Sequence, residues 1–427
     1  GCQRPRAGAI EIGLDADGDS VDIRAAGKVT GRVGPFNVAL LDAQLASHTL
    51  RKIDRLGRPS PFRTQDDPID ATNVFVGRAT MNVLGESRVG MIVTNGDPQS
   101  DRDNTLVGAD FDYRDSNFLG SGDVLQGNLW FQNSFTQGED GAEAAWGAEL
   151  QYPNDKHFVF LNFRDLNADF YPALGFVNRT GIRRYEARYR YRIRPQDEVV
   201  RTIDPFVYGL LVTDRSNEVQ SGALLLRPIA LEAHVGGTIQ MTYKRGFERV
   251  LTPFRITPRA AIPIGSYDTD ELIVELEAGR HRRLYGYIEV RYGDFFSGRR
   301  VGVTWKAEWR PSRYVRLGLE YIHNKLWLDS LDDPTSPLTS TVSRVETRTR
   351  VARVRINLQF TPDIAWLTFV QYDNLSDQVG VNSRLRWIIE DGREVFLVFN
   401  QLLLAEDGNV QNVRTEPLAK VGWTFRF

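Results

Sequence analysis

Apolar and polar residues alternate along several long segments of this chain. In the segment 184–193, every odd position carries an apolar residue or Tyr, and every even position carries a charge. The same two-residue period recurs at 142–152, 271–278 and 300–310. Successive side chains of a strand point to opposite faces, so this period predicts β-strands with one apolar face and one polar face.

The length of these runs indicates what the apolar face meets. They are about ten residues long, which is the length of a tilted strand that crosses a bilayer, whereas soluble strands average about five or six residues. No stretch of the chain approaches the roughly 18 consecutive apolar residues of a transmembrane helix. We therefore predict an all-β fold, a transmembrane antiparallel up-and-down β-barrel.

The predicted connections alternate between short turns and long polar loops, as they do in bacterial barrels. We count about 21 or 22 strands and favour 22, because bacterial barrels have even strand numbers. Residues 1–19 are interpreted as a lead-in with a candidate first strand near 10–14, and residues 20–427 as the barrel. The predicted long loops are Ser47–Ala71, Asn167–Thr180, Leu251–Thr269, Asn324–Ser343 and Leu402–Pro417. The alternation slips by one residue near Val351-Ala352, which predicts a β-bulge.

The chain ends on an amphipathic aromatic strand. From residue 419 to residue 427 every odd position is apolar. The pattern polar-x-Gly-x-x-apolar-x-apolar, filled here by Lys420, Gly422, Phe425 and Phe427, resembles the closing strand that the barrel assembly machinery reads. An ordinary C-terminal strand of a soluble sheet is the alternative. Together with the long strands, the pattern favours the outer membrane of a Gram-negative bacterium, with membrane lipid and the assembly machinery as partners.

Charge and cysteine content narrow the function classes. The chain has 427 residues with 53 Lys and Arg against 55 Asp and Glu, a net charge of −2, so no global field favours nucleic acid. The single cysteine excludes an internal disulfide and a zinc cluster of thiolates. With no initiating Met and no signal peptide, the sequence is interpreted as a mature or excised fragment.

Charged residues on the polar face would line the lumen of the predicted barrel. The candidate lumen charges are Arg184, Arg188, Arg190, Arg192, Glu271, Glu275, Glu277, Arg353 and Arg355, with Arg348 and Arg350 beside the last pair. One interpretation is a pore whose charged walls select solutes. The other is cross-strand ion pairing in a wet interior, and it is the simpler one because lumen-facing strands are polar in any barrel.

One predicted loop is unusually apolar. The segment 169–179 contains aromatic residues and a proline between two long strands. Such a loop should not stand in water, so we expect it to fold into the barrel and constrict it. The residues of this candidate constriction are Asp169, Phe170, Tyr171, Pro172, Gly175, Phe176 and Arg179.

The sequence offers little support for an enzyme. The five histidines are scattered, no His pair has the spacing of a metal site, and no Gly-x-Ser-x-Gly elbow occurs. Only His323, followed by Asn324, stands where an outer loop could hold a catalytic histidine, and an interfacial histidine is the simpler interpretation. We therefore expect no catalytic residue, metal or cofactor.

Several less generic strings resemble a known family. The chain is similar to the barrel part of the outer-membrane family listed as domain of unknown function 5916, through the strings Gly27–Gly31, Leu41-Asp42, Thr72-Asn73, Thr94-Asn95, Gly108–Phe111, Asp169–Arg179, Gly293–Phe295, Gly298–Arg300, Phe360–Asp363, Val370–Tyr372 and Asn382–Trp387. The resemblance implies an outer-membrane barrel. It brings no catalytic mechanism, and the carbohydrate-binding-like sandwich that precedes the barrel in that family is absent here.

These observations leave two function classes open. The leading one is a pore or surface-anchoring barrel for glycan-related or other polar solutes. The alternative is an outer-membrane hydrolase with its site among the extracellular loops, and a closed barrel with neither current nor activity would favour a third, a scaffold for a partner protein.

Removal of Phe427 should impair membrane insertion before it affects any transport, because the terminal aromatic residue belongs to the predicted assembly signal. The measurement is the fraction of protein folded in outer membranes, followed by electrophoretic mobility without heating. Normal assembly of the truncated protein would contradict this prediction.

Overall fold

The computed structural model describes residues 9–15, 21–53, 69–332, 341–406 and 409–424, and every regular element in these ranges is a β-strand. The main sheet consists of β2 (Ile23–Val33), β3 (Phe36–Leu45), β5 (Asn73–Val83), β6 (Ser87–Asn95), β7 (Asn104–Phe118), β8 (Asp123–Thr136), β9 (Ala144–Pro153), β10 (His157–Leu166), β11 (Ile182–Tyr191), β12 (Val200–Ile203), β13 (Phe206–Asp214), β14 (Val219–Ala233), β15 (Thr238–Val250), β18 (Gly265–Glu277), β19 (Leu284–Phe295), β20 (Gly298–Ser312), β21 (Val315–Leu331), β22 (Val342–Thr361), β23 (Ile364–Asp373), β24 (Gln378–Glu390), β25 (Arg393–Glu406) and β26 (Asn409–Trp423).

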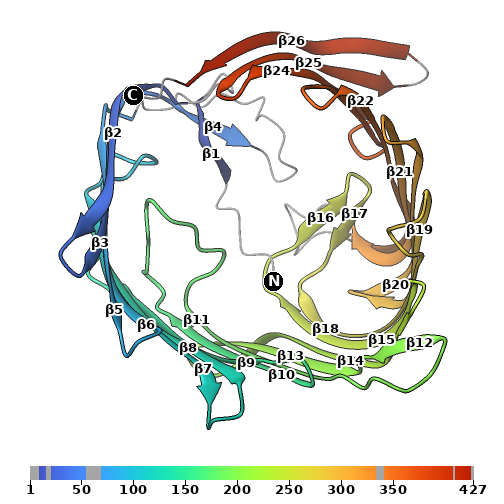
Figure 1. Ribbon diagram of the computed structural model, residues 1–427, viewed down its shortest axis with the longest axis horizontal. Coiled ribbons are helices and arrows are strands. Elements are labelled where there is room, and N and C mark those ends of the chain that lie inside the picture. Colours follow the sequence, from blue (N-terminus) through green and yellow to red (C-terminus); the bar gives the residue numbers. More distant parts are fainter. Residues whose placement is uncertain (1–8, 16–20, 54–68, 333–340, 407–408, 425–427) are drawn as a thin grey trace. The chain divides into compact units, whose positions relative to one another are not determined.

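These 22 strands form an antiparallel up-and-down sheet of the β-barrel class (Figure 1). The predicted fold class is therefore confirmed. The strand β12 is short and lies in the connection between β11 and β13, which pair directly with each other. No helix in the described part of the chain is long and apolar enough to cross a membrane.

The chain divides into two compact units. Unit 1 comprises residues 1–192, 206–225 and 246–252, and unit 2 comprises residues 193–205, 226–245 and 253–427. In both units, neighbouring strands pair in continuous antiparallel register over most of their length. Such pairing satisfies the backbone hydrogen bonds that lipid cannot satisfy.

Short and longer connections alternate from β3 to β11 as predicted, but not in the rest of the chain, where β19 and β20 are joined by residues 296–297 alone. The tight turns include Gly34, Gly85 and Gly392, whose φ angles of 58°, 78° and 84° lie in the left-handed region. Glycine adopts this region without the steric cost of a side chain. The opposite ends of the strands carry the longer connections, such as 167–181 between β10 and β11.

Three predictions, two about loops and one about a bulge, are wrong. The segment 402–417 is largely paired strand, because β25 and β26 pair from Arg393↔Trp423 to Glu406↔Asn409. In the described part of the segment 324–343, residues 324–331 belong to β21 and residues 342–343 to β22. Finally, β21 and β22 pair without a register shift from Val315↔Leu358 to Leu331↔Val342, so the bulge predicted near residue 351 does not form.

Two hairpin-like sheets lie outside the main sheet. The strand β1 (Ala9–Asp15) pairs with β4 (Leu50–Ile53), so the candidate strand near residues 10–14 exists but is not a strand of the main sheet. The strands β16 (Phe254–Thr257) and β17 (Ala260–Ile262) form a second hairpin within the predicted polar loop 251–269.

The start of β20 has no room for a side chain at Gly298. A Cβ there would lie 1.8 Å from the Trp327 carbonyl oxygen of β21. Gly298→Ala should therefore force the two strands apart and destabilise the fold by about 1–3 kcal/mol. Urea unfolding in detergent micelles measures this cost. Gly286→Ala is the matched control, because an added Cβ there meets nothing within 4 Å. Equal stability of the two variants would contradict the close approach.

Candidate functional site

The two faces of the sheet carry different side chains. In unit 1 one face exposes apolar residues, such as Leu129 (57%) and Phe131 (51%), and we call it the outer face. The opposite face, called the inner face, carries charged residues such as Arg78 and Asp110. In unit 2 the same alternation exposes Trp305 on the outer face. The apolar outer face and the charged inner face are those of a sheet with lipid on one side and water on the other.

On the inner face of unit 1, arginines pair with aspartates across neighbouring strands. Arg78 binds both carboxylate oxygens of Asp110, with an Nη2–Oδ1 distance of 2.8 Å. Arg88 donates to Asp112 Oδ2 from Nη2 at 2.5 Å and from Nε at 3.1 Å. Each of these two arginines is therefore neutralised by an aspartate on the same part of the inner face.

The predicted basic segment lies on β11 and is partly neutralised by its own strand. Arg184 Nη2 donates to Glu186 Oε2 at 3.0 Å. The guanidinium of Arg188 lies 5.5 Å from the ring centroid of Tyr208 on β13. Both arginines face inward, but each has a partner that stabilises its charge.

The last two arginines of this segment lie at its short-turn end. Arg190 lies over the ring of Phe158, 5.7 Å from the centroid, and Arg192 lies just beyond the end of β11. Arg192 Nη1 donates to Asp155 Oδ1 at 3.0 Å. The structure thus places Arg192 at the edge of the sheet.

The predicted acidic side chains of β18 each have an arginine partner. The pairs are Glu271–Arg300, with an Oε1–Nε distance of 3.0 Å, Glu275–Arg227 at 3.1 Å and Glu277–Arg280 at 2.7 Å. Glu271 is almost fully buried, with 4% of the residue exposed. A buried carboxylate is costly without an opposite charge, and Arg300 supplies that charge to Glu271.

Glu320 on β21 is shared by two cations. Its carboxylate lies 3.2 Å from Lys306 Nζ and 3.3 Å from Arg353 Nη1. Arg353 also donates from Nε to Gln371 Oε1 at 2.9 Å. The other predicted charge of β22, Arg355, lies 5.4 Å from the ring centroid of Phe369. The candidate lumen charges therefore form local networks within each unit.

Arg348 and Arg350 do not belong to these networks. In the uninterrupted register of β22 they alternate with Thr347 and Thr349 and lie on the face opposite to Arg353. Arg348 pairs with Glu346 at 2.7 Å near the long-connection end of the strand. The strand β22 has 20 residues, about twice the length that crosses a bilayer, so both faces of its far end can be charged.

The apolar loop between β10 and β11 lies against the inner face of unit 1 (Figure 1). Phe170 is 4% exposed and packs with Leu106 and Ala145, which lie on β7 and β9. Asp169 lies close to Gly141, where a Cβ would meet its carboxylate. By contrast, Phe176 is 74% exposed, so only part of the loop is packed.

Polar contacts hold the same loop in place. Asn104 Nδ2 donates to the Tyr171 carbonyl at 2.9 Å, and the Tyr171 N–H donates to Ser134 Oγ at 3.0 Å. Tyr171 Oη lies 3.4 Å from Asp97 Oδ1. Pro172 accepts the Gly175 N–H at 2.8 Å, which closes a turn within the loop. The loop is therefore anchored at Phe170–Ala173 by both packing and hydrogen bonds.

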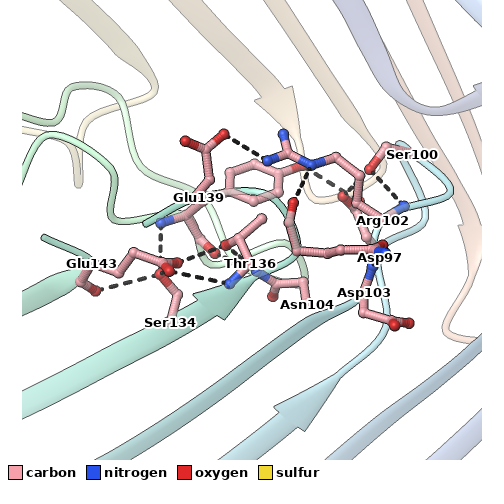
Figure 2. A network of polar contacts seen from close by, with 11 residues as sticks. Asp97, Ser100, Arg102, Asp103, Asn104, Ser134, Thr136, Glu139 and Glu143 are labelled. Carbon is pink, nitrogen blue, oxygen red and sulfur yellow. Dashed lines mark hydrogen bonds and ion pairs between the residues drawn. The ribbon is translucent and has the colours of Figure 1, made fainter. Parts of the chain in front are cut away.

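Figure 2 shows the polar network beneath this anchor. Glu143 accepts the hydroxyls of Ser134 and Thr136 at 2.9 and 2.7 Å, and Asn104 Nδ2 donates to Thr136 Oγ1 at 3.0 Å. Glu143, Ser134 and Asn104 are all buried. Buried polar groups with satisfied hydrogen bonds favour one conformation, so the network makes a rigid base for the loop. Arg179, at the other end of the loop, is half-buried.

The hairpin β16–β17 is the inward element of unit 2 that sequence reasoning missed. Ala260, Ala261 and Ile262 are completely buried. The Ala261 N–H donates to Ser330 Oγ on β21 at 2.8 Å, and the Thr257 hydroxyl lies 3.3 Å from that of Thr347. The sequence feature that could have predicted this hairpin is the contiguous apolar run 260–264 inside a loop that is otherwise polar.

One carboxylate stabilises the base of the connection between β21 and β22. Asp332 accepts hydrogen bonds from the hydroxyls of Thr341 and Ser343, the second at 2.9 Å. These hydrogen bonds favour the ionised form and hold the pKa of Asp332 below its usual value.

The structure describes the candidate catalytic histidine and half of the candidate C-terminal signal. His323 stacks on Tyr321 with ring centroids 6.2 Å apart, and its Nδ1 has no hydrogen-bond partner in the described residues. Within those residues, no group of three or more His, Cys, Asp or Glu side chains could hold a metal. Lys420 and Gly422 lie on β26, whereas Phe425 and Phe427 lie outside the described residues.

Comparisons with known proteins add a distant structural likeness. No family model matches the chain, and no curated protein matches it. Among solved structures, the chain is similar to the crystal structure of the siderophore receptor PirA from Pseudomonas aeruginosa, with a TM-score of 0.38 and 11% identity over 94% of this chain and 72% of the receptor. A likeness of this size does not bear on function.

Glu320→Gln should make any conductance more anion-selective, because Lys306 and Arg353 would lose their shared carboxylate while the shape of the wall stays the same. The measurement is the reversal potential of the refolded protein in a planar bilayer under a salt gradient. Glu346→Gln, which removes an outer-face carboxylate, is the control. An unchanged reversal potential in a folded, conducting Glu320→Gln variant would contradict the prediction.

Proposed function

We propose that this protein is an outer-membrane β-barrel of a Gram-negative bacterium that binds polar solutes and lets them pass, with glycan-related solutes as one candidate class. The observation that carries the proposal is the loop 167–181, which is anchored on the inner face by packing and by hydrogen bonds to buried side chains. A loop held in this position would narrow the space through which a solute passes along the inner face.

The character of the inner face supports polar solutes. Arg78 and Asp110, like Glu275 and Arg227, neutralise each other across strands. A wall of matched charges offers donors and acceptors without a strong net field, which suits neutral polar molecules better than simple ions. Tyr287, which donates to Glu275 at 3.0 Å, adds an aromatic surface of the kind that contacts the apolar faces of sugars.

The exposed aromatic residues on the outer face support membrane insertion. Trp305 and Trp309 are 39% and 51% exposed on β20, and Trp366 and Trp387 are 45% and 48% exposed. In water such a surface would favour association, whereas in a bilayer it is the expected lipid contact. Membership of the family with domain of unknown function 5916, and recognition of β26 by the assembly machinery, are part of this proposal.

Deletion of residues 168–177 should raise the single-channel conductance several-fold, because it removes the packed part of the loop from the path. The measurement is conductance of the refolded protein in planar bilayers. Phe176→Ser is the matched control, since this exposed side chain makes no part of the anchor, and it should leave conductance near that of the parent protein.

A second variant guards against a general loss of structure. Asn104→Ala removes the hydrogen bond to the Tyr171 carbonyl without shortening the chain, and should give intermediate or flickering conductance. Unchanged conductance in both the deletion and Asn104→Ala would overturn the proposed role of the loop.

A further inference from the structure

An apolar groove of about 770 Å³ lies on the outer face of unit 1 and crosses strands from β7 to β14. Its floor consists of small residues: Gly127, Ala148, Ala187, Gly209 and Ala223. Longer side chains, including Leu129, Leu161 and Tyr185, rise beside them. The volume lies within the range of about 300–1,000 Å³ that is usual for pockets that bind organic ligands.

The strand register places a charged row next to the groove. Residues opposite one another across β8 to β13 form one row of the groove: Leu129, Ala148, Phe163, Tyr185 and Leu211. The next row on the same face, two residues nearer the long connections, is Phe131, Trp146, Asp165, Arg183 and Thr213. Two residues along a strand span about 7 Å, so the charges lie directly at the end of the groove.

Together with Arg215, just beyond the end of β13, the charged row has an excess of positive charge. Asp165 accepts from Arg183 Nε at 3.1 Å and from Arg215 Nη1 at 2.8 Å, so two guanidinium groups share one carboxylate. The Asp165 side chain is 8% exposed, whereas those of Arg183 and Arg215 are 26% and 40% exposed. The accessible part of this cluster is therefore cationic, and its complement is an anion.

An aromatic ladder connects the charged row with the groove. The rings of Trp146 and Phe163 have centroids 4.9 Å apart, and those of Phe163 and Tyr185 are 5.0 Å apart. Trp146 is in the charged row and the other two are in the groove row. Aromatic residues with a polar atom favour the boundary between hydrocarbon and headgroups, so this ladder marks the level at which a lipid changes from chain to headgroup.

We propose that the groove is a binding site for an anionic phospholipid, with an acyl chain over the small residues and the phosphate at Arg183 and Arg215. This inference rests on the proposed membrane insertion. One lipid molecule supplies both parts of the complement, an apolar chain for the floor and an anion for the arginines. A small floor residue such as Gly209 leaves space that bulk lipid fills transiently, whereas a tethered headgroup would retain one chain there.

The test measures lipid retention by native mass spectrometry. Refolded protein in neutral detergent is mixed with phosphatidylglycerol or with phosphatidylcholine of the same acyl chains. The parent protein should retain phosphatidylglycerol about tenfold better than phosphatidylcholine. The two arginines bind the phosphate of either lipid, but only in phosphatidylcholine does the headgroup also carry a cation that the arginines repel. Combined Arg183→Gln and Arg215→Gln should reduce phosphatidylglycerol retention to the level of phosphatidylcholine. Arg344→Gln, which breaks the exposed pair with Asp329, is the control.

A second variant tests the groove without altering charge. Gly209→Leu should lower retention of both lipids, because its side chain enters the floor, where a Cβ meets nothing within 4 Å. Gly286→Leu, at an equally open position in unit 2, should not. The proposal is overturned if the parent protein retains both lipids equally, or if neither the combined arginine variant nor Gly209→Leu changes retention. It is also overturned if Gly209→Leu instead abolishes a dimer of this chain.

Planar-bilayer insertion of the same preparations separates this inference from the proposed function. Parent protein that conducts but shows no preference for phosphatidylglycerol would refute the lipid site alone. Parent protein that neither inserts nor conducts would refute the proposed function.

Discussion

The two-residue period of the strand is the constraint on which the rest of this structure depends. A strand in a bilayer must satisfy every backbone N–H and C=O through its neighbours, which fixes the pairing register and leaves only the side chains free to vary. Alternate side chains then face two different solvents. In β20, Trp305 faces outward and Lys306 inward, and a shift by one residue would reverse both. Register is therefore held by the cost of charge in lipid as well as by hydrogen bonds.

On the inner face, many charged side chains lie close together on neighbouring strands. Their charges are balanced by local ion pairs: Arg78 with Asp110 in unit 1, and Glu320 with Lys306 and Arg353 in unit 2. Each pair joins different strands and so also supports their register. The same wall gives loops a polar surface on which to dock. Asn104 and Ser134 are residues of the inner face whose side chains hydrogen-bond to the backbone of residue 171.

Local periodicity predicted the fold because each long strand carries its own signal. The strands and tight turns around Gly34, Gly85 and Gly392 follow from alternation and from turn residues alone. The predictions failed where strands continue beyond the apolar zone. The outer end of β26 carries polar residues on both faces, such as Asn412, Arg414 and Thr415, so a paired strand looked like the loop 402–417. In β22 the charged residues occupy even positions up to Arg350 and odd positions from Arg353. This change of face within one regular strand resembled the slip that a bulge produces.

The candidate sites were less predictable because they depend on contacts between distant residues. The aromatic content of 169–179 marked that loop, but nothing local indicated that Asn104 would hold Tyr171 or that Phe176 would be exposed. The buried hairpin β16–β17 depends on Ser330, 69 positions from its partner Ala261.

The groove illustrates the same limit on the outer face. Ala148, Ala187 and Gly209 each interrupt a run of large apolar residues, and singly each looks like a weak point in a strand. Only the register of four strands gathers them into one depression and brings Arg183 to its end. Bulk lipid requires no particular shape from the surface that it covers. A depression that combines small residues, an aromatic ladder and excess positive charge is therefore better explained by one lipid than by the bilayer in general.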